Sequence, residues 1–347
     1  MGAKDGLSPD ALTIAEIFRS DGYVTGISGK WHIGHLPETR PHRQGFESAF
    51  YCPLSNNQLK EIWRNDEIAI NPVDNRHFTE HFHTEALRFI RENHEKSFFL
   101  YLPHTAPHFP VEAHPDWKGK SKFGEYGDVV EELDARTGEM LKLLDELKLK
   151  ENTIVIFTSD NAAQNGEKAS NLPLRGNKWS PLEGGTRVPG IVSWPGKIPP
   201  NQTSDALTAA IDLLPTLCHA AGIDLVKHTQ NKPIIDGVDI FETLAGKSTT
   251  HARTELLHWH GKFDKPQALT QGDWKIFLDQ RDALTKADPA KKPDGPGSPA
   301  LYNLREDIAE SKDLSQQFPD KVETLKQRFN QLAEELDSSP KLKITTP

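Results

Sequence analysis

Apolar positions along the chain switch repeatedly from helical spacing to the pattern of a buried strand. Short apolar runs at residues 23–28, 97–102 and 153–159 predict strands. Each run follows a stretch with apolar residues three or four positions apart, which predicts an amphipathic helix. The apolar positions of the three helices are Leu12, Ala15, Ile17 and Phe18; Phe82, Ala86, Phe89 and Ile90; and Tyr126, Val130, Leu133, Met140, Leu144 and Leu147. Repeated helix–strand pairs predict an α/β fold with a parallel sheet covered on both faces.

The same layer is expected to continue past residue 159. Residues 190–195 form another strand-like run, and residues 212–221 predict a helix capped by Asp212, with Pro215 in its first turn and Gly222 after its end. We expect this α/β domain to occupy residues 1–248.

A smaller antiparallel subdomain is expected over residues 249–347. Four short strands are predicted, at residues 255–259, 267–270, 274–278 and 301–304. A terminal helix closes the subdomain, and its apolar positions are Val322, Leu325, Phe329, Leu332 and Leu336. Residues 286–299 are rich in Pro, Lys, Asp and Gly, which predicts a solvated loop.

Composition narrows the class of protein. The 347 residues are 36% hydrophobic and 26% charged, enough for a substantial core. A net charge of −9 and the lack of a basic block argue against a nucleic-acid surface. No run of 18 apolar residues predicts a membrane span. The only two cysteines, Cys52 and Cys218, are too few for a disulfide framework and lack metal-ligand spacing.

Polar residues gather where the predicted strands end, and ligands of open α/β sheets bind beyond those carboxyl ends. Asp160 and Asn161 offer oxygen ligands for Ca²⁺ or Mg²⁺. Lys30 and Lys178 supply charge for an oxyanion, and histidines that follow the first and second strands can transfer protons. Taken singly, each group has an ordinary explanation, such as an Asx turn or a surface patch. Together they predict a site for a cation and an anion.

The residues resemble the formylglycine-dependent sulfatases of the arylsulfatase type, in the alkaline-phosphatase-like superfamily. The matching segments occur in the family's order: Thr13-Ile-Ala-Glu, Gly22-Tyr-Val-Thr, Gly29-Lys-Trp-His-Ile-Gly, His108-Phe-Pro, Thr158-Ser-Asp-Asn, Leu174-Arg-Gly-Asn-Lys, Glu183-Gly-Gly-Thr-Arg-Val-Pro, Asp212-Leu-Leu-Pro-Thr and Leu301-Tyr-Asn-Leu. The resemblance implies an alkaline-phosphatase-like fold and hydrolysis of a sulfate ester, either an aryl sulfate or a sulfated carbohydrate.

The resemblance also implies roles for individual residues. Asp160 and Asn161 would bind a divalent cation, usually Ca²⁺, with Mg²⁺ as the alternative. The residues around the sulfate would be Lys30, His32, His108 and Lys178. His108 with Lys178 would help to protonate the departing alcohol, and His32 would assist the nucleophile or the later release of sulfate. Ser55 lies where some members place another polar contact, although an ordinary loop serine is the simpler explanation.

Two parts of the family's site are missing from the sequence. These are the paired aspartates after the first strand and the C-x-P-x-R or S-x-P-x-R segment whose Cys or Ser becomes formylglycine. Cys52 lacks the Pro and Arg positions and follows Lys30, so we interpret it as a buried or loop thiol. Ala162 replaces the glycine that usually follows Asp-Asn. We therefore expect a truncated sequence, lacking about two or three βα units, with poor solubility and no turnover.

Three hypotheses follow from the sequence. The first is a sulfatase whose nucleophile is encoded upstream, and Lys30, His32 and Lys178 favour it. The second is a phosphoesterase or phosphonate hydrolase of the same superfamily, and the third is an inactive remnant that binds sulfated glycans. Loops at 54–73, 112–124 and 225–237 would form the pocket walls. For a full-length form we expect a periplasmic or secreted location and maturation by a formylglycine-generating or maturase enzyme. The substrate and the oligomeric state stay open.

Overall fold

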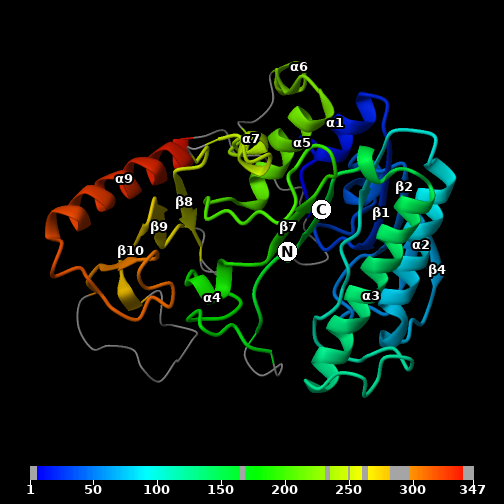
Figure 1. The fold of residues 1–347 in the computed structure, drawn as a ribbon, viewed down its shortest axis with the longest axis horizontal. Helices are drawn as coiled ribbons and strands as arrows, with labels where there is room; N and C mark the ends of the chain where they lie inside the picture. Colours follow the sequence, from blue (N-terminus) through cyan, green and yellow to red (C-terminus); the bar gives the residue numbers. More distant parts are fainter. Residues whose placement is uncertain are drawn as a thin grey trace. The chain divides into compact units, whose positions relative to one another are not determined.

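The computed structural model describes residues 6–164, 169–230, 235–248, 251–259, 265–281 and 297–338, and Figure 1 traces them along the chain. Backbone packing divides the chain into two compact units. The first comprises Met1–Thr153, Ile211–Phe241 and Pro340–Pro347, and the second comprises Ile154–Ala210 and Glu242–Ser339. The predicted domain boundary at residue 248 therefore falls inside the second unit. Most of the predicted loop at 286–299 lies outside the described residues, and so do residues 231–234.

The first unit is built around a five-stranded sheet with the strand order β4-β3-β2-β1-β5. Its centre is parallel, as predicted, because β1 (Val24–Lys30) pairs in parallel with both β2 (Ser48–Cys52) and β5 (Phe98–Tyr101). The short strands β3 (Ile62–Arg64) and β4 (Glu67–Ile70) add an antiparallel edge. The prediction of a loop over residues 54–73 is therefore wrong, since strands of three and four residues carry too little pattern to be recognised.

Helices cover both faces of this sheet. Successive residues of β2 point to opposite faces: Tyr51 packs in one cluster with Ala15 of α1, whereas Phe50 packs in another with Phe82 of α2. Figure 1 shows α2 against the sheet with α3 alongside it. The helices of this unit are α1 (Ile14–Ser20), α2 (Phe78–Asn93), α3 (Gly124–Glu146), α5 (Leu213–Ala221) and α6 (Leu225–Thr229). The 3-10 turns η1 (Pro37–Thr39), η2 (Pro41–Arg43), η3 (Asn75–His77), η4 (Lys150–Asn152) and η5 (Ala210–Asp212) lie between these elements.

Local sequence signals agree with the observed start of α1 and the observed end of α5, whereas two predictions about these helices are corrected. A capping box between Thr13 and Glu16 starts α1, and Gly222 ends α5 in the left-handed conformation. Asp212 does not cap α5 through its side chain, because its carboxylate accepts the Val238 N–H instead. The predicted stripe of α3 is also partly wrong, since Val130 is 42% exposed.

The second unit contains two separate sheets. β6 (Val155–Thr158) pairs in antiparallel fashion with β7 (Gly190–Ser193) in a two-stranded sheet. The prediction that both strands extend the parallel layer is therefore wrong for the described strands. An apolar run indicates that a strand forms, but the partner is chosen by long-range pairing that the run does not encode.

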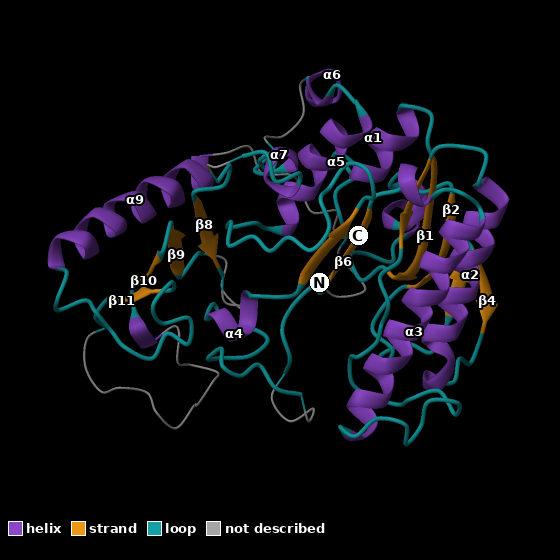
Figure 2. Cartoon of the chain, viewed as in Figure 1, coloured by secondary structure: helices purple, strands orange, loops and turns teal. Residues whose placement is uncertain are grey.

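The predicted antiparallel subdomain is confirmed in the second unit. Its four strands lie in the order β11-β10-β9-β8 with antiparallel pairing throughout, and Figure 2 shows them beside α9. Leu325 and Phe329 of α9 pack against Leu269, Ile276 and Leu301 of the sheet. The elements are β8 (Glu255–His258), β9 (Ala268–Gln271), β10 (Trp274–Phe277), β11 (Ala300–Asn303) and α9 (Pro319–Ser338), with the short helices α4 (Glu183–Thr186) and α7 (Phe241–Leu244) before them.

Replacing Phe82 with Ala should lower the free energy of unfolding by about 3–5 kcal/mol, because the ring is fully buried between α2 and the sheet. Phe123→Ala is the matched control, since that ring is 83% exposed, and we expect a change within about 0.5 kcal/mol. Urea unfolding of both variants measures the difference. Equal stability of the two variants would show that the α2 face is not part of the core.

Candidate active site

The structure places the predicted site residues in two sets, one in each unit. Lys30, His32, Ser55 and His108 belong to the first unit, whereas Asp160, Asn161 and Lys178 belong to the second.

Three parallel strands end side by side in the first unit and carry the first set. The backbone N–H of Lys30 donates to the Pro103 carbonyl (2.7 Å), and that of Trp31 donates to the Cys52 carbonyl (3.0 Å). These bonds join the end of β1 to the segment that follows β5 and to the last residue of β2. Gly29 allows this close approach, because a Cβ at that position would lie 2.1 Å from the Pro103 oxygen. Lys30 and His32 therefore stand at the carboxyl edge of the sheet, as the sequence predicts.

His32 is held in an unusual backbone conformation beside Ser55. Its φ of 56° lies in the left-handed region, which non-glycine residues rarely adopt. Its N–H donates to the Pro53 carbonyl (3.1 Å), and its ring Nδ1 lies 3.5 Å from the Ser55 hydroxyl. Ser55 is buried, and its own N–H donates to the Gln58 side chain. Ser55 thus belongs to the same group of side chains as His32.

His108 follows β5, and its ring orientation is set locally. Nδ1 lies 2.7 Å from the Phe109 carbonyl, which places the proton of a neutral ring on that nitrogen. The Asn56 amide donates to the Pro110 carbonyl (3.4 Å), so the segment after β2 is tied to the segment that carries His108. The neighbouring His104 is chemically different, because burial lowers its pKa to about 3. His104 is therefore not suited to proton transfer near neutral pH.

In the second unit, the turn after β6 is held against the loop that carries Lys178. The Lys178 N–H donates to the Ala163 carbonyl (3.0 Å), and the Ala162 N–H donates to the Gly185 carbonyl (3.4 Å). Asn171 adds two side-chain bonds to the backbone of Ala163. Ala162 has no positive φ, so alanine fits this turn without strain.

The exposed carboxylate of Asp160 makes no hydrogen bond or ion pair within the described part of the chain. Asn161 follows it directly, so a carboxylate and an amide are presented together on a turn that backbone bonds fix. The ammonium of Lys178 lies 5.6 Å from the centre of the Trp179 ring, a cation–π distance. The structure therefore brings Lys178 near the Asp160–Asn161 turn through its backbone.

A buried ion triad supports this loop. The fully buried Lys275 ammonium on β10 lies 2.8 Å from a carboxylate oxygen of Glu183 and 3.1 Å from one of Glu310. The Glu183 N–H also donates to Glu310 (2.7 Å), and Arg187 lies 3.3 Å from the second Glu183 oxygen. The triad joins the Glu183-Gly-Gly segment to the antiparallel sheet.

The two carboxyl groups of the triad titrate differently. Burial alone would raise the pKa of Glu183, but the Lys275 and Arg187 charges outweigh it and hold that pKa below its usual value. Burial raises the pKa of Glu310, and the nearby Glu183 charge adds to this rise. Glu183 therefore stays ionised against Lys275.

Cys52 is confirmed as a buried thiol. It is fully buried, its thiol donates to the Leu54 carbonyl, and burial raises its pKa to about 12. A thiol with so high a pKa is a poor nucleophile at neutral pH.

Sequence reasoning did not identify Lys275 and Glu310, because a single Lys within a strand and a Glu in a loop carry no spacing signal.

Comparisons with known proteins identify the family. A family model for sulfatases matches residues 3–223. N-acetylgalactosamine-6-sulfatase of Canis lupus familiaris is 33% identical over 296 residues, covering 79% of this chain and 55% of the relative. Steryl-sulfatase of Homo sapiens is 38% identical over 369 residues, covering 79% and 62%. The chain belongs to the sulfatase family, and it spans about half the length of the first of these relatives.

Solved structures agree with this assignment. A Bacteroides thetaiotaomicron chain from work on the metabolism of multiple glycosaminoglycans superposes with a TM-score of 0.81 at 25% identity, covering 96% of this chain and 85% of that chain. A sulfatase from Pseudoalteromonas sp. superposes with a TM-score of 0.88 at 22% identity, covering 99% and 77%, which supports the fold. The predicted α/β class of the alkaline-phosphatase-like type is thereby confirmed. Within the described ranges, no helix has both the length and the apolar character needed to cross a membrane.

Replacing Lys275 with Met should destabilise the protein by about 3–5 kcal/mol at pH 8, because two buried carboxylates lose their only shared cation. The lowered pKa of Glu183 means that its stabilising contribution is lost only as the pH falls through that lowered pKa, so it is intact at both pH 8 and pH 5. In the variant, burial raises the pKa of both carboxyl groups with no Lys275 charge to oppose it, so they take up protons between pH 8 and pH 5. The cost of the substitution should therefore be smaller at pH 5.

Urea unfolding at pH 8 and pH 5 measures this pH dependence. Lys326→Met is the control in the same unit, since Lys326 makes only an exposed contact of 3.9 Å with Glu323, and its effect should stay within about 1 kcal/mol. A loss of stability for Lys275→Met that is the same at both pH values would contradict the ion-triad account.

Proposed function

We propose that the protein containing this chain hydrolyses sulfate esters. The observation that carries the proposal is the fixed Asp160–Asn161 turn with Lys178 on the adjoining loop, in a chain of the sulfatase family. A cation held by oxygen ligands, together with a nearby lysine, can bind an anion whose negative charge is carried by its oxygen atoms. Lys30 and His32 form a comparable group at the edge of the first unit's sheet.

The sulfatase family generally uses a divalent metal, and we propose Ca²⁺ held by Asp160 and Asn161. A carboxylate and an amide oxygen are ligands that a hard cation prefers. The Asp160 carboxylate is exposed and is not engaged by any other described residue. When bound, the cation would neutralise charge on the sulfate oxygens.

The chain's own side chains are assigned to anion binding and proton transfer. Lys30 and Lys178 attract the sulfate and offset its negative charge. His108, whose ring is oriented by the Phe109 carbonyl, donates a proton to the departing alcohol. His32, whose ring lies beside the Ser55 hydroxyl, transfers a proton to or from the nucleophile.

The family's formylglycine nucleophile has no counterpart in this sequence, because no Cys or Ser is followed by Pro two residues later and Arg four residues later. We propose that an upstream segment supplies it and that a formylglycine-generating or maturase enzyme modifies it. Sequencing the DNA upstream of the Met1 codon tests this. An open frame with paired aspartates and such a motif supports the proposal. A region with neither motif supports an inactive binding protein instead.

Substrate class and location form part of the same proposal. The relatives' names include a sulfatase of N-acetylgalactosamine and a steryl-sulfatase, so we propose a sulfate ester of a carbohydrate or of a ring alcohol. Matched sulfate and phosphate esters separate this activity from a phosphoesterase. We also propose a periplasmic or secreted location, which fractionation of the source cells would test.

Replacing His108 with Ala in the mature enzyme should lower kcat for an alkyl sulfate by about 10²–10⁴-fold, because the alcohol then leaves without a proton donor. The loss should be much smaller for 4-nitrophenyl sulfate, whose phenolate leaves without protonation. His94→Ala, at the exposed end of α2, is the control and should change neither rate. Equal losses on both esters would remove His108 from the role of proton donor.

Replacing Asp160 with Asn should raise the Ca²⁺ concentration for half-maximal activity by at least about tenfold, because a neutral amide replaces the charged ligand. Asp205→Asn is the control, since Asp205 is exposed in the same unit. Activity is measured after chelation and Ca²⁺ titration. An unchanged Ca²⁺ requirement in Asp160→Asn would exclude Asp160 as a ligand.

A further inference from the structure

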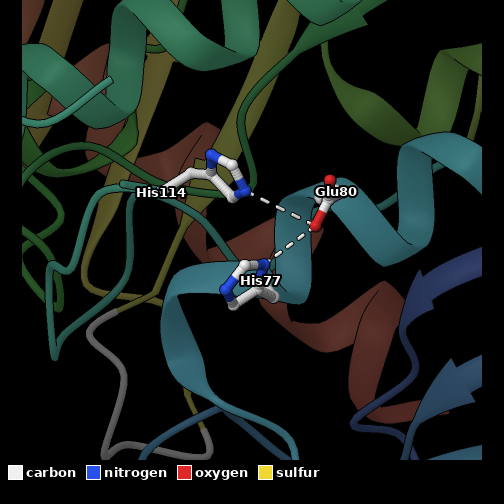
Figure 3. A group of neighbouring side chains, drawn as sticks. All are labelled: His77, Glu80 and His114. Carbon is white, nitrogen blue, oxygen red and sulfur yellow. Dashed lines mark hydrogen bonds and ion pairs between the residues drawn. The ribbon is translucent and has the colours of Figure 1, made fainter. Parts of the chain in front are cut away.

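A cluster of two histidines and a glutamate lies at the start of α2, outside the residues assigned above. Figure 3 shows His77 directly before α2, Glu80 in the first turn of α2 and His114 on a separate loop, with their side chains turned toward one another. His77 Nδ1 lies 2.8 Å from Glu80 Oε2, and His114 Nε2 lies 3.5 Å from the same oxygen. All three atoms lie within 4.8 Å of one another.

The backbone fixes each of these positions independently. His77 ends η3 and precedes α2, so Glu80 lies three residues further along on the same helical face. His114 begins a turn in which its carbonyl accepts the Trp117 N–H (2.8 Å). Its own N–H donates to the buried Glu132 of α3 (3.4 Å). The three side chains are therefore brought together by α2, α3 and the loop between β5 and α3.

The spacing fits a small transition-metal ion. A tetrahedral zinc ion with ligand bonds of about 2.1 Å places its ligand atoms about 3.4 Å apart. The observed separations of 2.8 Å and 3.5 Å lie on either side of that value. Two imidazole nitrogens and one carboxylate suit zinc, whereas Ca²⁺ prefers oxygen ligands. The side chains of His77 and Glu80 are 33% and 39% exposed, so water can reach a fourth position.

The His114 ring is held in place by contacts at its other nitrogen. Its side chain is largely buried, and its Nδ1 accepts the backbone N–H of Asp116 at 3.2 Å. The Asp116 carboxylate lies 3.6 Å from the same nitrogen. Because Nδ1 accepts a hydrogen bond, the proton of a neutral ring lies on Nε2, and a metal ion bound at Nε2 would displace that proton. An open cavity of about 540 Å³ is lined by Asn75, Arg76 and Ala113, the chain neighbours of the ligands.

We propose that His77, Glu80 and His114 form a binding site for a divalent transition-metal ion of the zinc class, with one coordination position open to solvent. The competing explanation is a pair of histidine–glutamate ion pairs that bind no metal. The two explanations differ in what each substitution does to metal affinity.

The test uses Co²⁺ as a spectroscopic probe on the full, tag-free chain, in excess Ca²⁺ to occupy oxygen-rich sites. We expect one equivalent of Co²⁺ to give visible d–d absorption of low-coordinate type and to be displaced by Zn²⁺. His77→Ala, His114→Ala and Glu80→Gln should each weaken Co²⁺ binding at least tenfold. His94→Ala, a histidine at the other end of α2, should bind Co²⁺ like the unsubstituted chain.

Circular dichroism in a chelator establishes that each variant is folded. If His114→Ala fails to fold, His77→Ala and Glu80→Gln decide the question, because both of those side chains are partly exposed. The proposal is overturned if the unsubstituted chain gives no such absorption. It is also overturned if the folded variants bind Co²⁺ as tightly as His94→Ala, which would mean adventitious binding by other histidines.

Discussion

A single buried ammonium, that of Lys275, fixes the part of the second unit that carries the proposed cation ligands, Asp160 and Asn161. Lys275 on β10 is placed between Glu183 and Glu310, and an ion in that position is tolerated only because both carboxylates face it. Glu183 begins α4, and the carbonyl of Gly185 on the same helix accepts the Ala162 N–H of the turn after β6. The position of the Asp160–Asn161 turn therefore depends on a charge in the antiparallel sheet.

In the first unit, backbone hydrogen bonds rather than an ion triad hold the strand ends together. Backbone bonds from Lys30 and His32 to the segments after β5 and β2 hold the strand ends together, and Gly29 permits the approach. In both units, flexible side chains such as Lys30 and Lys178 are positioned through their backbone amides. The side chains can then adjust to an anion while their starting points stay fixed, which limits the entropy lost on binding.

The sequence predicted local structure far better than strand partners. The end of α5 at Gly222 and the four strands of the antiparallel sheet follow from signals within a few residues. The pairing of β6 with β7 does not, because each is an apolar run that fits several neighbours. The same limit applies to the candidate metal ligands. The spacing of His77 and Glu80 can be recognised in the sequence as one helical turn, but no signal near His114 indicates that it lies beside them.

The two candidate cation sites differ in ligand chemistry, and this bears on how metal dependence should be interpreted. Asp160 and Asn161 offer only oxygen, whereas the cluster at α2 offers two imidazole nitrogens and one carboxylate. A hard ion such as Ca²⁺ should therefore prefer Asp160 and Asn161, and a borderline ion such as Zn²⁺ should prefer the cluster at α2. A general chelator removes both kinds of ion, so a loss of activity after chelation does not identify the metal responsible. Separate restoration with Ca²⁺ and with Zn²⁺ makes the distinction, because each ion refills only the site whose ligands it prefers.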